Sequence, residues 1–193
     1  YVGRFGLGAW AFHLVYRAAQ RWAGLHMLKG MTLTMESVSA EYLAMRSDLA
    51  CLRMTAEEFA RLDENSTVTS TFLDGARSRD DWCYCFLDGD AIVSFGWYSR
   101  RPVPVTGGYA IHYSDRFVYM YHGFTAPSHR GQQLHAIGMA TALQQAHEDG
   151  FEGLISYVEA DNASSLRSIS RLGYQVFGTC TLIGVGGKRA TFT

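Results

Sequence analysis

The sequence predicts a mixed α/β fold, in which helices flank a central sheet. Two observations support this prediction: β-rich and helical segments follow one another in the order β–α–α–β–β–β–α–β–α–β, and the apolar residues of several segments repeat with the matching strand or helix period. The 193 residues, of which 48% are apolar, suit one domain with a substantial core. The formal net charge of −1 gives no electrostatic argument for binding nucleic acid, which is not expected as a partner.

The first segment, residues 1–30, is predicted to be a basic amphipathic helix that precedes the main domain of residues 31–193. Helical periodicity runs from Leu7 to Leu28, and the first 35 residues contain no Asp or Glu. One face of this helix carries Phe12, Val15, Ala19, Trp22 and His26, while Arg17 and Arg21 fall elsewhere. The uncharged run between Arg4 and Arg17 has 12 residues, which is fewer than the roughly 20 needed to cross a bilayer.

Three roles are open for this helix. It packs on the domain or on a second subunit of a homodimer, or it lies on an anionic membrane surface as a peripheral contact through residues 7–28. The third role is a targeting peptide, although no small-residue cleavage site is evident. The chain begins with Tyr1 rather than Met, which leaves open whether residues precede it.

The next part of the chain is predicted to contain one strand, two helices, a helical turn and a hairpin. The segment Thr55-Ala-Glu-Glu58 is a capping box, in which the Thr hydroxyl and the Glu carboxylate each satisfy an orphan N–H at a helix start. Asp88-Gly89-Asp90 marks a tight hairpin turn, because Gly supplies the positive φ that such a turn requires. The predicted elements are a strand at 31–38, helices at 39–47 and 54–64, a helical turn at 72–79, and hairpin strands at 82–87 and 91–100.

After a polar loop at residues 101–115, strands and helices are predicted to alternate. A helix runs from Gly131 to Glu148 and stops at Gly150, which suits a left-handed helix cap. In the strand at 116–125, alternation places Val118, Met120 and His122 on one face and Phe117, Tyr119 and Tyr121 on the other. The remaining predicted elements are a strand at 154–159, a helix at 162–172, and strands at 174–184 and 190–193.

The turn before the helix that starts at Gly131 is a candidate anion site. The first backbone N–H groups of a helix lack intrahelical partners, and the helix dipole favours an anion beside them. The segment from His122 to Leu143 reads as a strand end, a turn that contains Pro127 and Arg130, and this helix. A glycine in such a turn is a weak signal alone, since many strand–helix connections carry one.

A second stretch strengthens the signal. Residues 158–174 contain Asn162 after a strand, then a short helix, then Leu172-Gly173-Tyr174. Together the two stretches resemble the Gcn5-related N-acetyltransferase (GNAT) superfamily, whose motif A is Q/R-x-x-G-x-G/A at a strand-to-helix turn and whose motif B is an Asn followed by a helix that ends in L-G-F/Y. The resemblance covers residues 81–185 and implies the acyl-CoA N-acyltransferase fold, with a mixed and splayed central sheet.

The resemblance also implies how a donor binds, and it implies no metal. Two central parallel strands, here 116–125 and 154–159, diverge so that the pantetheine arm of an acyl-CoA fits between them. Backbone groups at Phe124 and Thr125 then hold the thioester carbonyl, and Asn162 and Ser165 contact the donor arm. The turn that would hold the pyrophosphate comprises Arg130, Gly131, Gln132, Gln133, Leu134, His135 and Ala136.

The chain departs from motif A at two positions. Gln133 and His135 stand where the superfamily has glycine or alanine. Their side chains are expected either to lie on the helix surface or to contact the donor, His135 as a cation near phosphate. The departure also opens acyl carrier protein as an alternative donor, since it carries the same phosphopantetheine arm without the same nucleotide.

Three residues are candidates for the catalytic base. Tyr121 and His122 lie on the strand that ends at Thr125, and an imidazole near its intrinsic pKa can take a proton from an ammonium. Glu159 ends the adjacent parallel strand; a structural role is the alternative for each candidate. Ile169 stands where the superfamily usually has a Tyr acid and is expected in the core, so no general acid is assigned. A thiolate can leave unaided, since its pKa is far below that of an amine, or Ser168 or another hydroxyl can assist it.

The sequence therefore predicts an N-acyltransferase that moves an acetyl group from acetyl-CoA to an amine of a small molecule or peptide, without a covalent enzyme intermediate. Two alternatives stay open: a longer-chain acyltransferase that uses acyl carrier protein or acyl-CoA near a membrane surface, and a non-catalytic binding domain of the same fold. The four cysteines lack zinc-site spacing, and Cys83-x-Cys85 is poorly placed for a disulfide, so a reducing, cytoplasmic location is expected.

Overall fold

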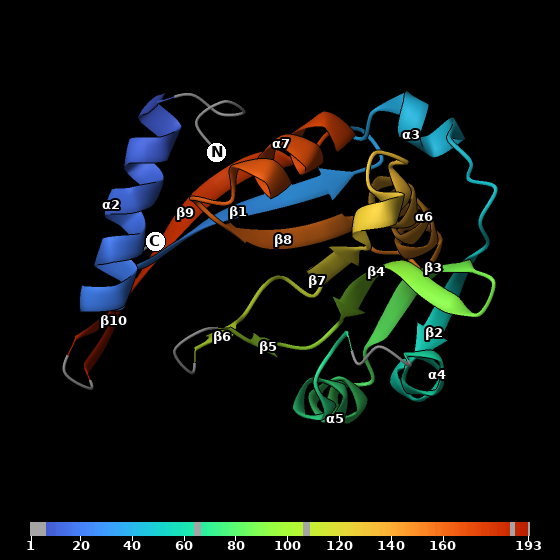
Figure 1. The fold of residues 1–193 in the computed structure, drawn as a ribbon, viewed down its shortest axis with the longest axis horizontal. Coiled ribbons are helices and arrows are strands. Elements are labelled where there is room, and N and C mark those ends of the chain that lie inside the picture. The colour runs from blue at the N-terminus through green and yellow to red at the C-terminus, as the bar shows by residue number, and fades with distance from the viewer. Residues whose placement is uncertain (1–6, 64–66, 106–108, 186–187, 193) are drawn as a thin grey trace.

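The computed structural model describes residues 7–63, 67–105, 109–185 and 188–192. Its main feature is an eight-stranded sheet with helices on both faces (Figure 1). The strand order is β10-β9-β1-β8-β7-β4-β3-β2, and a separate two-stranded ribbon is formed by β5 and β6. Neighbouring strands of the large sheet are antiparallel except for β7 and β8, which are parallel. The predicted mixed α/β fold class is confirmed.

The elements have the following bounds. The strands are β1 (His26–Thr34), β2 (Cys51–Thr55), β3 (Trp82–Asp88), β4 (Ala91–Ser99), β5 (Val103–Pro104), β6 (Ala110–Ile111), β7 (Phe117–Thr125), β8 (Gly153–Glu159), β9 (Gln175–Val185) and β10 (Lys188–Phe192). The helices are α2 (Leu7–Ala23), α3 (Ala40–Ala44), α4 (Ala56–Leu62), α5 (Ser70–Arg79), α6 (Leu134–Glu148) and α7 (Ala163–Leu172), with a 3-10 turn, η2 (Pro127–His129), before α6.

The first strand of the chain is inserted into the half of the sheet built from its last third. β1 pairs with β8 on one side and β9 on the other, so that Leu28 faces both Glu159 and Cys180. Residues 26–28, predicted as the end of a helix, are therefore strand, because their backbone groups bond to neighbours on both sides. The boundary predicted between residues 30 and 31 falls inside β1.

Other boundaries differ where tertiary pairing overrides local pattern. The first two residues of the helix predicted at 54–64 belong to strand β2, and helix α4 begins at Ala56. The predicted end of that helix at Glu64 lies outside the described residues. The capping box is confirmed: Thr55 Oγ1 accepts from the Glu58 N–H at 3.3 Å, and Glu58 Oε2 accepts from the Thr55 N–H at 2.8 Å. The hairpin of β3 and β4 is also confirmed. The short strands β5 and β6 lie in the segment predicted as a loop.

Helices cover the two faces of the sheet and enclose separate cores. α3, α6 and α7 pack on one face, where Met139, Leu143 and Leu172 are fully buried. α4 and α5 pack on the opposite face, where Phe59 and Trp97 are fully buried (Figure 1). The sheet is therefore fixed from both sides near β7, which passes between the two cores.

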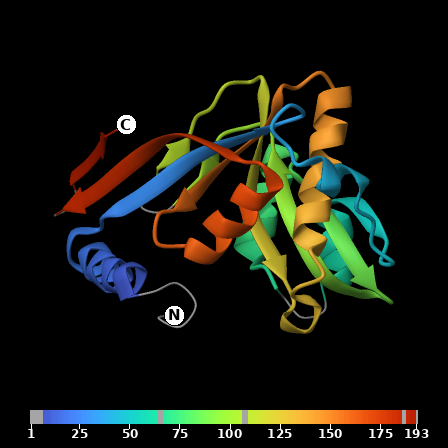
Figure 2. The same cartoon turned by 90° about the horizontal axis from the view of Figure 1, so that it is seen from above.

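The N-terminal helix α2 stands apart from these layers, at the outer end of the sheet beside β1 and β9 (Figure 2). Among the helices of the described residues, none is both long enough and apolar enough to cross a membrane. The helix is shorter than its periodicity suggested and ends at Ala23, because Gly24 adopts a positive φ of 54° and the chain then turns into β1.

Candidate active site

The two parallel strands of the sheet diverge after three residue pairs. β7 and β8 pair at Phe117 with Gly153, Val118 with Leu154, and Tyr119 with Ile155. Beyond that point β7 stays paired with β4 as far as Thr125, and β8 stays paired with β1 as far as Glu159. The splay expected between these strands is confirmed.

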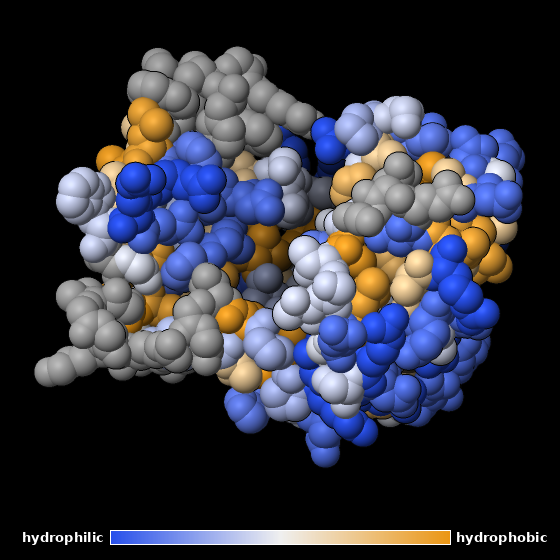
Figure 3. Space-filling model, turned by 60° about the horizontal axis from the view of Figure 1, so that its bottom comes forward, coloured by the Kyte–Doolittle hydropathy of each residue, from blue (hydrophilic) through white to orange (hydrophobic). Residues whose placement is uncertain are grey.

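A side chain marks the point of divergence. Ser156 Oγ donates to the carbonyl oxygen of Met120 at 2.9 Å, in place of a backbone bond between the strands. From Met120 to Thr125, the backbone groups of β7 that point away from β4 therefore face the split rather than a neighbouring strand. In the space-filling view the molecule is hollowed between its two halves, with apolar residues in the depth of the hollow (Figure 3).

A β-bulge on β7 lies inside the split. Gly96 pairs with Gly123 and Trp97 pairs with Tyr121, which leaves His122 without an opposite residue and with a positive φ of 40°. The simple alternation predicted for this strand is therefore wrong from His122 onward. Because of the bulge, Tyr121 and His122 lie on the same face, the one covered by α5.

His122 is held between aromatic rings while part of it stays open to solvent. Its ring centroid lies 4.9 Å from that of Phe72 on α5 and 5.9 Å from that of Phe95 on β4. Partial burial against these rings disfavours the imidazolium and lowers the pKa of His122 from its ordinary 6.5. At neutral pH the imidazole is accordingly an unprotonated base.

The turn after β7 presents backbone N–H groups. α6 begins at Leu134 rather than at Gly131 as predicted, because Gly131 and Gln133 both have positive φ, 90° and 59°. Gln133 is the N-cap residue, and its carbonyl accepts from the Ile137 N–H at 3.0 Å. Within the described residues, no hydrogen bond occupies the N–H groups of residues 131–136. Arg130 folds back, and its Nε donates to the Thr125 carbonyl at 3.3 Å.

The split and the turn thus combine an open strand edge with a helix N-terminus. Residues 47–174, well over half of the chain, match the model of the acetyltransferase (GNAT) family. The chain belongs to the GNAT family. The prediction of this family is confirmed, as is the enzyme class at the level of the family.

Two mycothiol acetyltransferases are relatives in sequence. That of Brachybacterium faecium is 35% identical over 92 residues, which are 48% of this chain and 25% of that protein. That of Kytococcus sedentarius is 26% identical over 143 residues, which are 69% of this chain and 44% of that protein. The chain therefore spans less than half the length of these curated relatives.

Solved structures agree on the fold. A GCN5-related N-acetyltransferase from Kribbella flavida has a TM-score of 0.55 at 18% identity, over 91% of this chain and 64% of that one. A GNAT-family acetyltransferase from Colwellia psychrerythraea has a TM-score of 0.57 at 12% identity, over 93% and 62%. AAC(6')-Iy in complex with the bisubstrate analog CoA-S-monomethyl-acetylneamine has a TM-score of 0.53 at 16% identity, over 68% and 94%.

His135 stands where the GNAT motif has glycine or alanine, and a glycine on β7 leaves space for its side chain. The imidazole points back under the sheet, and a Cβ added to Gly123 would meet its Cε1 at 2.4 Å. Burial lowers the pKa of His135 to about 4, although a hydrogen bond to the Phe95 backbone opposes this shift. This orientation favours a structural role for the side chain, and its contact with phosphate as a cation stays a prediction. Its backbone N–H still belongs to the first turn of α6.

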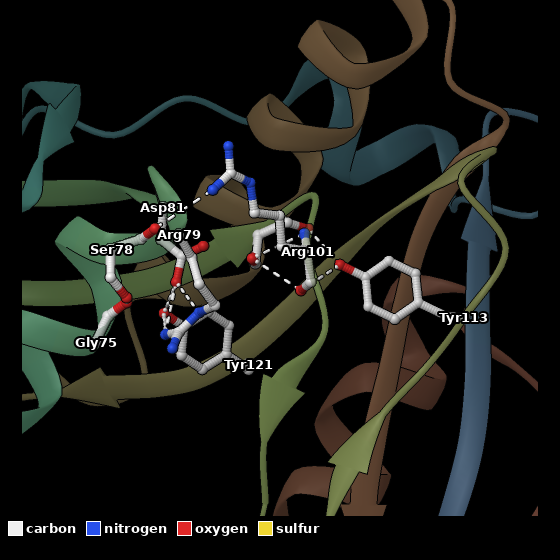
Figure 4. A network of polar contacts seen from close by, with 8 residues as sticks. Gly75, Ser78, Arg79, Asp81, Arg101, Tyr113 and Tyr121 are labelled. Carbon is white, nitrogen blue, oxygen red and sulfur yellow. Dashed lines mark hydrogen bonds and ion pairs between the residues drawn. The ribbon is translucent and has the colours of Figure 1, made fainter.

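A buried ion pair holds the neighbour of His122 in place (Figure 4). The Asp81 side chain is inaccessible to solvent, and its Oδ2 accepts from Arg79 Nε at 2.8 Å and from the Tyr121 hydroxyl at 2.7 Å. Burial, and then the Asp81 carboxylate, raise the pKa of Tyr121 far above its ordinary 10. Tyr121 therefore remains a phenol that donates to Asp81, which favours a positioning role over that of a base.

Sequence reasoning missed this network. Arg79 also donates from Nη2 to the Tyr121 oxygen at 3.3 Å, so that the end of α5, the residue before β3 and the middle of β7 are joined at one point. The three residues span 42 positions of the chain and have no recognisable spacing. The only signal in the sequence was the pair of opposite charges, Arg79 and Asp81, at the junction of a predicted helix and a predicted strand.

Glu159 lies at the end of β8 and is engaged by the N-terminal segment. The Tyr16 hydroxyl donates to its Oε2 at 2.5 Å, and its Oε1 lies 2.7 Å from Nδ1 of His26. These contacts connect α2 and β1 to the far side of the split. They give Glu159 a structural role, whereas its role as a base stays a prediction.

Motif B has the structure expected of it. Asn162 caps α7, since its Oδ1 accepts from the Ser165 N–H at 3.2 Å. Gly173 ends the helix with a φ of 114°, and a Cβ there would meet the Ser37 carbonyl oxygen at 2.1 Å. Ile169 is 7% exposed and lies in the core, as predicted. Contacts of Asn162 and Ser165 with a donor stay predictions.

Proposed function

We propose that the chain is an N-acetyltransferase that transfers an acetyl group from acetyl-CoA directly to an amine acceptor within a ternary complex. The observation that carries this proposal is the divergence of β7 and β8 after Tyr119 and Ile155, beside the unoccupied N–H groups before α6. An extended pantetheine arm can bond to an open strand edge as an added strand would. Its pyrophosphate then lies at the helix N-terminus, where the dipole favours anions.

In the proposed reaction, the amine nitrogen attacks the thioester carbonyl carbon, and the N–C bond forms as the carbonyl oxygen gains negative charge. Backbone N–H groups of β7 near Phe124 stabilise that oxyanion. The C–S bond then breaks, and the thiolate of CoA leaves with the electron pair. The proton lost by the amine passes to a base, so that the amide product is neutral.

His122 is the proposed base, since it is the exposed member of the Tyr121–His122 pair and is neutral at pH 7. The bulge turns its ring toward Phe72 on α5, the wall on the acceptor side of the split. Tyr121, bonded to Asp81, fixes the strand next to it. The proposed division of roles is therefore one base and one positioning residue.

Coenzyme A is preferred to acyl carrier protein as the donor. Acyl carrier protein was an alternative donor because Gln133 and His135 replace the small residues of the motif. The side chain of His135, however, is turned under the sheet, so that it leaves the backbone N–H groups of the turn available to a ligand. A diphosphate can therefore still meet the first turn of α6. The acceptor of the named mycothiol acetyltransferases is the first candidate for the acceptor of this chain.

Donor binding and turnover test the proposal separately. Acetyl-CoA is expected to raise the melting temperature more than an equal concentration of acetyl-pantetheine, because only the former carries the diphosphate. Thiol release is then followed with a panel of aminoglycosides, amino sugars and peptides. His122→Ala is expected to lose turnover and keep the thermal shift, whereas His147→Ala, at an exposed position of α6, serves as the matched control. Absence of any shift with acetyl-CoA would refute the proposal.

A further inference from the structure

The face of α2 that is turned toward the domain is polar. Tyr16 is 3% exposed, and its hydroxyl bonds to Glu159 and to the Met27 N–H. His13 Nδ1 lies 3.0 Å from Asp161 Oδ2, and Gln20 Nε2 lies 3.4 Å from His26 Nδ1. Among the side chains of this helix that the structure describes, polar contacts therefore hold it to the domain.

The opposite face of α2 is apolar and open. Val15 and Trp22, two helical turns apart on one side, are 70% and 87% exposed. Phe12 and Leu14 are 45% and 48% exposed on the flanks. A surface helix normally turns its apolar side to the core, so this helix is inverted relative to the domain that carries it. A contiguous apolar face of this kind is typical of an interaction site.

The charges on α2 indicate which kind of surface covers its apolar face. Arg21 is exposed and flanks the apolar side next to Leu14. Arg17 is also exposed but lies further round toward the polar side, where its Nη1 donates to Gln20 Oε1 at 3.2 Å, and the helix contains no Asp or Glu. If two copies of the chain paired through α2, these arginines would meet without a carboxylate of the helix to offset them. A surface that carries phosphate groups satisfies both arginines and also accepts the apolar side chains.

We propose that the outward face of α2 docks on an anionic lipid surface, with Val15 and Trp22 entering the headgroup region and Arg17 and Arg21 bonding lipid phosphates. The domain is then held by the polar face of the helix, through Glu159 and its neighbours. Docking in this way keeps the helix parallel to the membrane plane.

The contacts between α2 and the domain determine which part of the domain lies nearest the lipid surface. Glu159 ends β8 and Asp161 precedes α7, so the helix is fixed to the loop at the far side of the split. A docked helix therefore brings that loop close to the lipid headgroups. The proposal uses none of the residues assigned to the donor or to catalysis, except that Glu159 anchors the helix.

Flotation of the full chain with phosphatidylcholine vesicles, with and without phosphatidylglycerol, tests this proposal. Binding is expected only with phosphatidylglycerol, and salt is expected to weaken it. Each arginine near an anionic surface is worth about fivefold in partitioning, so Arg17→Gln with Arg21→Gln should weaken binding about 25-fold. The matched control is Arg46→Gln with Arg61→Gln, which removes two exposed charges outside α2 and should leave binding unchanged.

Trp22→Glu adds a second test, because the residue is exposed and its replacement should leave the melting temperature unchanged. This variant is expected to lose vesicle binding. Three results would overturn the proposal: equal binding to both vesicle types, binding unaffected by the loss of the two arginines, or a concentration-dependent dimer that Trp22→Glu dissociates. The last result would assign the face to a second copy of the chain. Because acetyl-CoA affinity is measured separately, failure here leaves the proposed enzymatic function standing.

Discussion

The contact between Gly123 and His135 gives the sharpest test of how β7 is positioned. A Cβ at residue 123 would lie 2.4 Å from Cε1 and 2.6 Å from Nε2 of the imidazole, well inside contact distance. The same ring atom lies against Gly96 on β4, 3.2 Å from the position that a Cβ would take there, so the imidazole sits between two glycines. Gly123 is not among the residues with positive φ, so an Ala there is opposed by sterics and not by backbone strain.

Gly123→Ala is therefore expected to destabilise the protein by about 1–3 kcal/mol, the usual range for overpacking. For a chain of this length, a loss of about 2 kcal/mol lowers the melting temperature by about 4–8 °C. The measurement is urea unfolding of the wild type and the variant, followed by circular dichroism. Gly178→Ala is the matched control, because a Cβ at that position of β9 meets nothing within 4 Å.

The decisive step is the double variant. His135→Ala alone should cost stability, because it empties a buried site. In that background Gly123→Ala should cost less than about 0.5 kcal/mol, since the ring it would strike is gone, and the two effects should be strongly non-additive. Equal stability of Gly123→Ala and the wild type, or additive effects in the double variant, would refute the proposed role of this contact.

Four further predictions concern pH, hydrogen bonding and helix capping. Since burial lowers the pKa of His122 from its ordinary 6.5, turnover should fall as the pH drops through that lowered pKa, and the residual turnover of His122→Ala should lack this dependence in a pH–rate profile. Burial lowers the pKa of His135 from 6.5 in the unfolded chain to about 4 in the folded one. This difference adds up to about 3 kcal/mol to the free energy of unfolding above pH 6.5, and the added stability is lost as the pH falls toward 4. Urea unfolding of His135→Gln should not show this loss. Tyr121→Phe should cost about 1–3 kcal/mol, because the buried Asp81 loses a donor, and a variant as stable as the wild type would contradict the bond. Asn162→Ala should cost about 1 kcal/mol by loss of the α7 cap, which thermal unfolding measures.

Much of the fold could be predicted because local chemistry agrees with the tertiary structure. The capping box at Thr55, the turn at Gly89 and the cap at Gly173 each follow from backbone requirements that act over a few residues. Motif B was likewise placed correctly, because Asn162 acts within its own helix. Signals of this kind do not depend on what the rest of the chain does.

The errors came from long-range pairing. Residues 26–28 have a helical pattern, but they form a strand because β8 and β9 are both available as partners. The bulge at His122 moves that side chain to the face of Tyr121, and alternation along a single strand gives no sign of it. The burial of His135 depends on Gly123, which comes from a different element. These features require knowledge of neighbours distant in the sequence.

The position of β1 between β8 and β9 affects how the protein reaches this structure. Leu28 pairs with Glu159 and Cys180, so the strand made first has to await partners made much later. Contacts of such sequence separation carry a large loop-closure cost and slow the folding of a domain. While the chain is being synthesised, both edges of this strand remain open, and they are the places at which misassembly between nascent chains would begin.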